Sequence, residues 1–228
     1  MINMNSSISF AVSYTPEETA DFSYRDIKFL SDVKIDETTS TLSSLKYLNL
    51  SNNQITTLEN NFFEKFQGVL YLDISNNRIT KIESVQNLPN LQIIDFSKNE
   101  VSLIEDFENC KETLERIIAY KNNIIAVKFK AQMDKLTYLD IRHNQINTIS
   151  FGNLVPHLKT LKVDNNLLVN INELSLFPEL EVFSAADNGI LEFPKLSNQN
   201  SLRTINLANN KIETLKNLNL TKLLTLDA

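Results

Sequence analysis

The chain has 228 residues, of which 42% are hydrophobic and 22% are charged, and its formal net charge is −6 at pH 7. No apolar run approaches the roughly 18–20 residues of a membrane span, so we expect none. The sequence pI near 5.1 disfavours nucleic acid as a partner, because binding phosphates requires a basic face. With only three glycines and five prolines, the composition predicts one elongated unit without flexible linkers.

Residues 1–44 precede a repeating region, and we expect them to form a cap over its first repeat. Alternating apolar residues from Ile8 to Tyr14 predict a half-buried strand. A helix start is predicted next, with Thr15 as the N-cap, Pro16 at the first helical position and Glu18 completing a capping box. One or two further strands are predicted from the apolar residues Ile27, Phe29, Val33 and Ile35.

From Leu45 onward the chain repeats one phrase, L-x-x-L-x-L-x-x-N-x-I, in which other apolar residues replace some leucines. Its eight asparagines are 22 to 24 residues apart, at Asn53, Asn77, Asn99, Asn122, Asn144, Asn166, Asn188 and Asn210. Leu48 and Leu50 are two residues apart, so on a strand they point to the same side. A single copy cannot bury such a stripe, whereas stacked copies cover one another. We expect the asparagines to bond backbone groups where the chain leaves each strand.

This pattern resembles the leucine-rich-repeat superfamily, and the resemblance covers about 170 of the 228 residues. It implies an α/β solenoid: a right-handed, curved horseshoe with a parallel β-sheet on its concave face and short helical or irregular convex segments. Most copies are similar to the 22-residue class. The first looks like the 24-residue class, in which a phenylalanine of the segment 60–66 fills the convex side of the core.

The expected organisation is an N-terminal cap at 1–44 and a repeat domain at 45–228, with eight repeats and a truncated ninth. The truncated copy begins with Leu223 and Leu226. An uncovered strand at this end can pair with another chain, so self-association through the C-terminal edge is one expectation. The other, which we favour, is that the sequence continues into a longer protein.

Three outward columns of the expected sheet determine what it can bind. The first column holds Tyr47, Tyr71, Ile93, Arg116, Tyr138, Thr160, Val182 and Thr204. The middle column holds Asn49, Asp73, Asp95, Ile118, Asp140, Lys162, Ser184 and Asn206. The third column holds Ser51, Ser75, Ser97, Tyr120, Arg142, Asp164, Ala186 and Ala208.

The central copies combine aromatic and arginine residues, a mixture enriched in binding hot spots. The predicted partner-binding residues are Tyr71, Asp73, Ile93, Asp95, Arg116, Ile118, Tyr120, Tyr138, Asp140, Arg142 and Lys162. An alternative stays open, because Asp in the middle column and Ser in the third are common in the family, so Asp73 and Asp95 could be solvated strand residues. Arg116, Tyr120 and Arg142 depart from that consensus and carry the stronger functional expectation.

The sequence gives catalysis little support, and we expect neither an enzyme nor a cofactor. It has no phosphate-binding, dinucleotide-binding or H-E-x-x-H motif. Cys110 is the only cysteine and is expected to be a buried or incidental thiol. Two histidines, His143 and His157, are too few for a metal site, although His143 could contribute to the concave rim.

The expected location is the cytoplasm, because one cysteine cannot form an intrachain disulfide and residues 1–7 lack a signal-peptide pattern. The alternative is a secreted protein whose leader has been removed. Glycosylation sequons at Asn5, Asn49 and Asn219 would suit that alternative.

The predicted function is that of a protein–protein interaction module that binds a partner through the concave face of the solenoid. Two alternatives remain open at this point. One is an extracellular or pathogen-surface recognition module for a receptor, carbohydrate or lipid. The other is a scaffold domain of a longer effector whose activity lies outside this chain.

Overall fold

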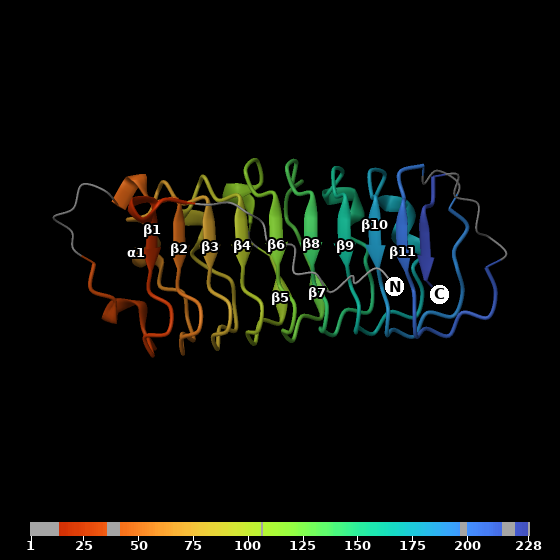
Figure 1. Cartoon of the computed structure of the whole chain (residues 1–228), viewed down its shortest axis with the longest axis horizontal. Coiled ribbons are helices and arrows are strands. Elements are labelled where there is room, and N and C mark those ends of the chain that lie inside the picture. The colour runs from red at the N-terminus through yellow and green to blue at the C-terminus, as the bar shows by residue number, and fades with distance from the viewer. Residues whose placement is uncertain (1–13, 36–41, 106, 197–199, 216–221, 228) are drawn as a thin grey trace.

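In a computed structural model of the chain, one parallel sheet of ten strands runs along the long axis of the molecule (Figure 1). The structure describes residues 14–35, 42–105, 107–196, 200–215 and 222–227. Neighbouring strands follow chain order, as β1 (Thr19–Asp21), β2 (Tyr47–Asn49), β3 (Tyr71–Asp73), β4 (Ile93–Asp95), β6 (Arg116–Ile118), β8 (Tyr138–Asp140), β9 (Thr160–Lys162), β10 (Val182–Ser184), β11 (Thr204–Asn206) and β12 (Thr225–Asp227). Each coil therefore adds one strand, which confirms the predicted parallel-sheet solenoid.

Among the described residues, every helix is a short turn of three to five residues. These are the α-helical turn α1 (Asn60–Phe63) and the 3₁₀ turns η1 (Pro16–Glu18), η2 (Leu30–Asp32), η3 (Leu42–Ser44), η4 (Val85–Asn87), η5 (Glu108–Cys110), η6 (Gly152–Leu154) and η7 (Asn172–Leu176). Two further short strands, β5 (Leu103–Ile104) and β7 (Ala126–Val127), pair in parallel. Among the described residues, no helix has the length and hydropathy of a membrane span.

A continuous hydrophobic core runs along the inside of the solenoid from Ile27 to Leu207. Each repeat strand contributes core residues two positions apart, such as Leu48 and Leu50, and both of these are fully buried. Phe63 and Phe66 are also fully buried beside α1, as expected for a first repeat of the 24-residue class. Because each coil covers its neighbours, burial depends on contacts between coils and not on any coil alone.

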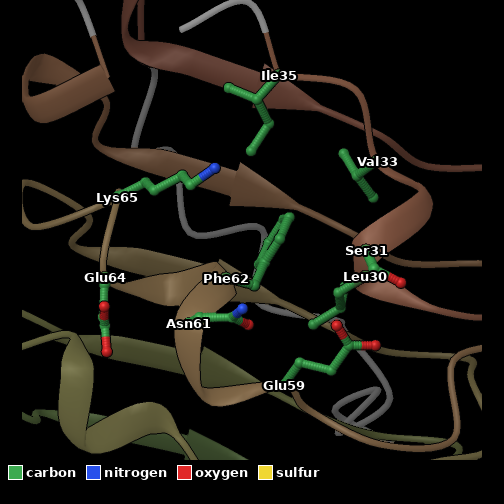
Figure 2. Close-up of a pocket in the computed structure, with 9 residues that line it drawn as sticks. All are labelled: Leu30, Ser31, Val33, Ile35, Glu59, Asn61, Phe62, Glu64 and Lys65. Carbon is green, nitrogen blue, oxygen red and sulfur yellow. The ribbon is translucent and has the colours of Figure 1, made fainter.

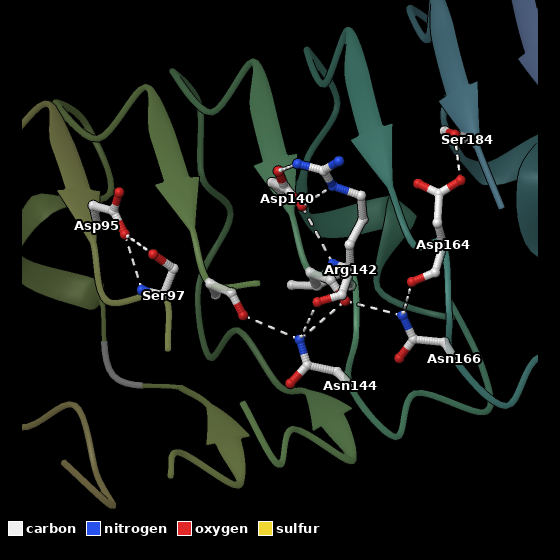
Figure 3. Close-up of polar contacts among 10 residues, drawn as sticks. Asp95, Ser97, Asp140, Arg142, Asn144, Asp164, Asn166 and Ser184 are labelled. Atoms are coloured by element: carbon white, nitrogen blue, oxygen red, sulfur yellow. Dashed lines mark hydrogen bonds and ion pairs between the residues drawn. The ribbon is translucent and has the colours of Figure 1, made fainter. Parts of the chain in front are cut away.

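The repeat asparagines form a ladder of hydrogen bonds between coils, as Figure 3 shows for Asn144 and Asn166. The Asn144 side-chain amide Nδ2 donates to the carbonyl oxygens of Ala119 in the preceding coil and Ile141 in its own, both at 3.0 Å. Its Oδ1 accepts from the backbone N–H of Ile124 at 2.9 Å. The amide thus satisfies backbone groups on two coils at once, which confirms the predicted structural role.

The residue before each ladder asparagine has a positive φ. These angles are 53–57°, at Asn52, Asn76, Lys98, Lys121, His143, Asn165, Asp187 and Asn209. Asn and Asp tolerate this left-handed conformation better than most residues with a side chain. The left-handed residue bends the chain away from the strand so that the following asparagine can turn inward.

The described part of the N-terminal segment is itself a coil of the solenoid, which was not predicted from the sequence. β1 pairs with β2 in parallel, with Thr19 opposite Tyr47 and Asp21 opposite Asn49. The helix start predicted at Thr15 is present as the 3₁₀ turn η1, and the Thr15 N–H donates to Glu18 Oε2 at 3.2 Å. The strand predicted from Ile8 lies outside the described residues, apart from Tyr14.

The prediction of strands from Ile27 to Ile35 is wrong. That stretch contains the 3₁₀ turn η2, and Ile27 and Leu30 are buried in the core. Their spacing is the one at which Ile55 and Leu58 follow β2, so these residues belong to the returning segment of a coil. The division into a cap at 1–44 and a repeat domain at 45–228 stays a prediction.

Replacing Asn144 by alanine tests the ladder. The change leaves the buried Ile124 N–H without its partner. It also removes one of the two hydrogen bonds that each of the Ala119 and Ile141 carbonyl oxygens accepts. We expect it to lower the free energy of unfolding by roughly 2–4 kcal/mol in urea denaturation followed by circular dichroism. Gln145→Ala, an exposed neighbour, should change it by less than about 0.5 kcal/mol. Equal effects of the two substitutions would contradict a structural role for the ladder.

Candidate functional site

The strand register aligns the three outward columns as the sequence predicted. Tyr71, Ile93, Arg116 and Tyr138 lie on successive neighbouring strands in the first column. The middle column places Asp73, Asp95, Ile118, Asp140 and Lys162 next to one another in the same way. Tyr120 and Arg142 follow β6 and β8 in the third column. All predicted site residues therefore lie on one side of the sheet, which we call the sheet face, although Ile93, Tyr138 and Asp140 are buried there.

A cluster of cations and aromatic rings occupies the sheet face over β6, β8 and β9. The Arg116 guanidinium carbon Cζ lies 3.9 Å from the centroid of the Tyr138 ring, and Lys162 Nζ lies 5.7 Å from the same ring. The Arg142 Cζ lies 5.8 Å from the Tyr120 centroid. Burial lowers the pKa of Arg116 and of Lys162, and the neighbouring charge of Arg142 lowers the Lys162 pKa further. We call these five residues the basic cluster.

Arg142 is held in place by a carboxylate of its own coil. Its Nε and Nη2 donate to Asp140 Oδ1 and Oδ2 at 2.9 and 2.7 Å, a bidentate pair visible in Figure 3. Asp140 is only 2% exposed, and the hydrogen bond to it raises the Arg142 pKa. Asp140 is thus a positioning residue that fixes Arg142, and it is not itself available to a partner.

The aspartates of the middle column make backbone hydrogen bonds that were not predicted from the sequence. Asp73 Oδ1 accepts from the Ser75 N–H and Asp95 Oδ1 from the Ser97 N–H, both at 2.9 Å. Asn49 makes the same bond to the Ser51 N–H at 3.0 Å. Both aspartates therefore stabilise the end of a strand, and whether they also contact a binding partner stays a prediction.

Acidic and aromatic side chains gather over β1 to β4. The Tyr47 and Tyr71 ring centroids are 4.8 Å apart, and Tyr14 stacks on Tyr47 at 5.9 Å. Burial, together with the charges of Asp73 and Asp95, raises the pKa of the Tyr71 hydroxyl. Burial and the nearby Asp73 charge raise the pKa of Asp95 to about 7, against the opposing effect of its hydrogen bonds to Ser97.

Other residues of this face were not singled out from the sequence. Asp21 enters the middle column through β1, because its coil lacks the repeat asparagine and was not recognised as a repeat. Asp164 Oδ1 accepts from Ser184 Oγ at 2.5 Å and from the Ala186 N–H at 2.9 Å, which links two coils. The apolar pattern of residues 20–30 could have revealed the coil that contains Asp21. Nothing in the sequence indicates the hydrogen bonds of Asp164.

The described residues outside the sheet face give no indication of catalysis. Cys110 is fully buried, which confirms the expectation of a buried thiol, and burial raises its pKa to about 12. His143 is exposed beside the ladder and has a φ of 55°. Within the described ranges, no group of three or more His, Cys, Asp or Glu side chains could hold a metal ion.

A pocket of about 360 Å³ lies away from the sheet face, between the segments that follow β1 and β2. Figure 2 shows the Phe62 ring in the middle of its lining residues, which are Leu30, Ser31, Val33, Ile35, Glu59, Asn61, Phe62, Glu64 and Lys65. Phe62 is almost completely buried and also packs against Phe63 and Phe66. The pocket is thus lined partly by a residue of the hydrophobic core and partly by a few charged side chains.

The raised pKa of Asp95 predicts a pH-dependent stability. The unfolded carboxyl loses its proton near pH 4 and the folded one near pH 7, so the free energy of unfolding should fall as pH rises between these values. Asp95→Asn keeps an acceptor for the Ser97 N–H, as Asn49 does for Ser51. We expect this variant to be more stable than the wild type by at least about 1 kcal/mol at pH 8, and by less at pH 4, in urea denaturation.

Asp21→Asn is the matched control, because it removes an exposed carboxylate that makes the same bond, to the Ser23 N–H. An equal gain in stability from Asp21→Asn would contradict the assignment to burial of Asp95.

Two family models, both described as leucine-rich repeat, match the chain by sequence. One matches residues 33–79 and 43–101, and the other matches residues 133–148. No curated protein matches the chain by sequence.

Solved structures with a similar fold include an internalin (inlF) from Listeria monocytogenes, with 25% sequence identity and a TM-score of 0.69 over 82% of this chain and 54% of the internalin chain. The internalin C2 (inlC2) of the same organism is 21% identical, with a TM-score of 0.68 over 83% of this chain and 80% of the other. Toll of Drosophila, solved as the Toll–Spatzle complex, is 23% identical, with a TM-score of 0.65 over 75% of this chain and 26% of the other.

The chain thus spans about half the length of the first internalin. The family models and the similar solved structures agree with three features of this chain. These are the repeated core residues, the parallel sheet with one strand per coil and the ladder of asparagines. The chain belongs to the leucine-rich-repeat superfamily.

Proposed function

We propose that the chain binds a protein partner through its sheet face, with the basic cluster at the centre of the contact. The observation that carries this proposal is the arrangement of Arg116, Tyr138 and Lys162, in which two cations lie over one aromatic ring on the sheet face. Arginine and tyrosine are, with tryptophan, the residue types enriched among binding hot spots. Arg116, Tyr120 and Arg142 depart from the repeat consensus at neighbouring coils, which distinguishes this part of the face.

The cluster suits binding because its side chains are held in position before a partner arrives. Arg142 is fixed by two hydrogen bonds to Asp140, and Arg116 is fixed by contact with the Tyr138 ring. Immobilising a long side chain on binding costs about 0.5–1.5 kcal/mol. Prior positioning on a sheet therefore reduces a cost that would otherwise subtract from affinity.

Comparison with other solenoids supports a protein as the partner. Toll, which has the same fold, was solved in a complex with Spatzle. The chain's own charge adds a second argument, since a partner with basic groups would be attracted to a protein with a net charge of −6. Such an interaction should weaken as salt is added.

The double substitution Arg116→Ala/Tyr120→Ala tests the proposal in a pull-down. Immobilised wild-type protein should retain a specific protein from a lysate of the source cells, and the variant should lose at least about 90% of it, because a loss of about 1.4 kcal/mol already lowers affinity tenfold. The stability of the variant, measured by thermal unfolding, should remain close to that of the wild type.

A control pair, Glu112→Ala/Lys135→Ala, removes two exposed charges from the linking segments. It should retain the same protein as the wild type. Retention by the face variant, or equal loss from the control pair, would move the binding surface away from the sheet face.

A further inference from the structure

The charges of the sheet face are segregated along the solenoid. Over β1 to β4, the charged residues of the three outward columns are Asp21, Asp73 and Asp95. Over β6 to β9 the same columns contain the three cations of the basic cluster. The two carboxylates there, Asp140 and Asp164, are buried. Asp140 accepts hydrogen bonds from Arg142, and Asp164 accepts them from the Ser184 hydroxyl and the Ala186 N–H. The face is therefore acidic at one end and basic in its middle.

At the acidic end, some carboxylate oxygens are not used by the hydrogen bonds that stabilise the strand ends. Both described hydrogen bonds of Asp95 use Oδ1, from the Ser97 N–H and Oγ, so that Oδ2 is left for another donor (Figure 3). Asp73 uses Oδ1 for the Ser75 N–H, and its Oδ2 has only a long 3.5 Å contact from the Tyr47 hydroxyl. Two carboxylate oxygens on adjacent strands thus remain able to accept hydrogen bonds.

The aromatic rings at the acidic end of the face and those in its basic middle differ in whether a cation of this chain contacts them. Tyr138 and Tyr120 already lie against cations of this chain, at 3.9–5.8 Å. Tyr47 and Tyr71 instead contact each other, and no described lysine or arginine lies over either ring. Ring faces beside carboxylates are a favourable environment for a guanidinium or ammonium group. The acidic end therefore lacks a cation that a partner can supply.

We propose that the partner presents a cationic and an anionic side chain together, the cation over Tyr71, Asp73 and Asp95 and the anion over Arg116 and Lys162. This inference rests on the proposed function and adds to it the polarity of the partner. The two positions are two to three strand spacings apart, about 10–14 Å. In an extended segment, side chains four residues apart lie on the same side and are separated by about 13–14 Å. A segment with a basic residue and an acidic residue four positions apart fits the face.

The test uses a synthetic peptide, acetyl-Arg-Thr-Val-Thr-Glu-amide, extended by a nitroxide spin label at either end. Paramagnetic broadening of the amide signals of the ¹⁵N-labelled chain reports which coils each end approaches. We expect the label at the arginine end to broaden signals of β2 to β4, and the label at the glutamate end to broaden signals of β6 to β9. Reversed broadening, equal broadening of both halves, or no localised broadening at millimolar peptide would overturn the proposal.

A charge-removing variant separates this inference from the proposed function. Asp73→Asn/Asp95→Asn keeps the backbone bonds, as Asn49 shows, and should weaken peptide binding about fivefold or more, which corresponds to about 1 kcal/mol. Asp227→Asn, in the same column on β12, should leave binding unchanged. If the protein retained in the pull-down is lost with Arg116→Ala/Tyr120→Ala but kept with Asp73→Asn/Asp95→Asn, the sheet face binds a partner and the proposed polarity is wrong.

Discussion

The asparagine ladder is the interaction on which the rest of the structure depends. Where the chain leaves each strand, backbone groups face an apolar interior, and leaving such a group without a partner costs about 1–3 kcal/mol. Asn122 shows the solution, because its amide donates to the Phe96 carbonyl of the preceding coil and accepts from that coil's Val101 N–H, both at 3.0 Å. One side chain thus satisfies two coils and also fixes their relative register.

That register gives the sheet face its chemical character. Because consecutive coils cannot slip past one another, side chains at equivalent positions form columns with a spacing of about 4.8 Å. Arg116 consequently lies beside Tyr138, and Asp73 lies beside Asp95, although each pair is 22 residues apart in the sequence. The face is assembled from residues that only the ladder brings together.

The fold could be predicted where the sequence repeats the residues that make the ladder. The first coil was missed because Arg25 occupies the position of the asparagine. There, Asn53 of the next coil bonds the backbone N–H groups of Arg25 and Ile27, at 3.0 and 3.1 Å. This coil has no asparagine of its own, and Ala20, Phe22, Ile27 and Leu30 preserve the apolar part of the pattern.

The columns of the candidate site were also predictable, since strand periodicity alone determines which residues point outward. The contacts within them were not. Whether Arg116 lies over Tyr138, or Asp164 bonds Ser184, depends on the conformations that these side chains adopt when they pack against neighbours from other coils. Sequence spacing determines the neighbours and leaves the side-chain conformations undetermined.

The middle column shows which property of its side chains the fold requires and which it does not. Asn49 and Asn206 make the same backbone bond as Asp73 and Asp95, so the fold requires only an oxygen acceptor at this position. An aspartate adds a negative charge, and burial beside a second carboxylate raises the pKa of Asp95 to about 7. That shift means that the ionised carboxyl is destabilising in the folded state at neutral pH. A charge that the fold does not need and that lowers its stability agrees with the proposal that the sheet face binds a cationic group of a partner, because such a group would favour the ionised carboxyl.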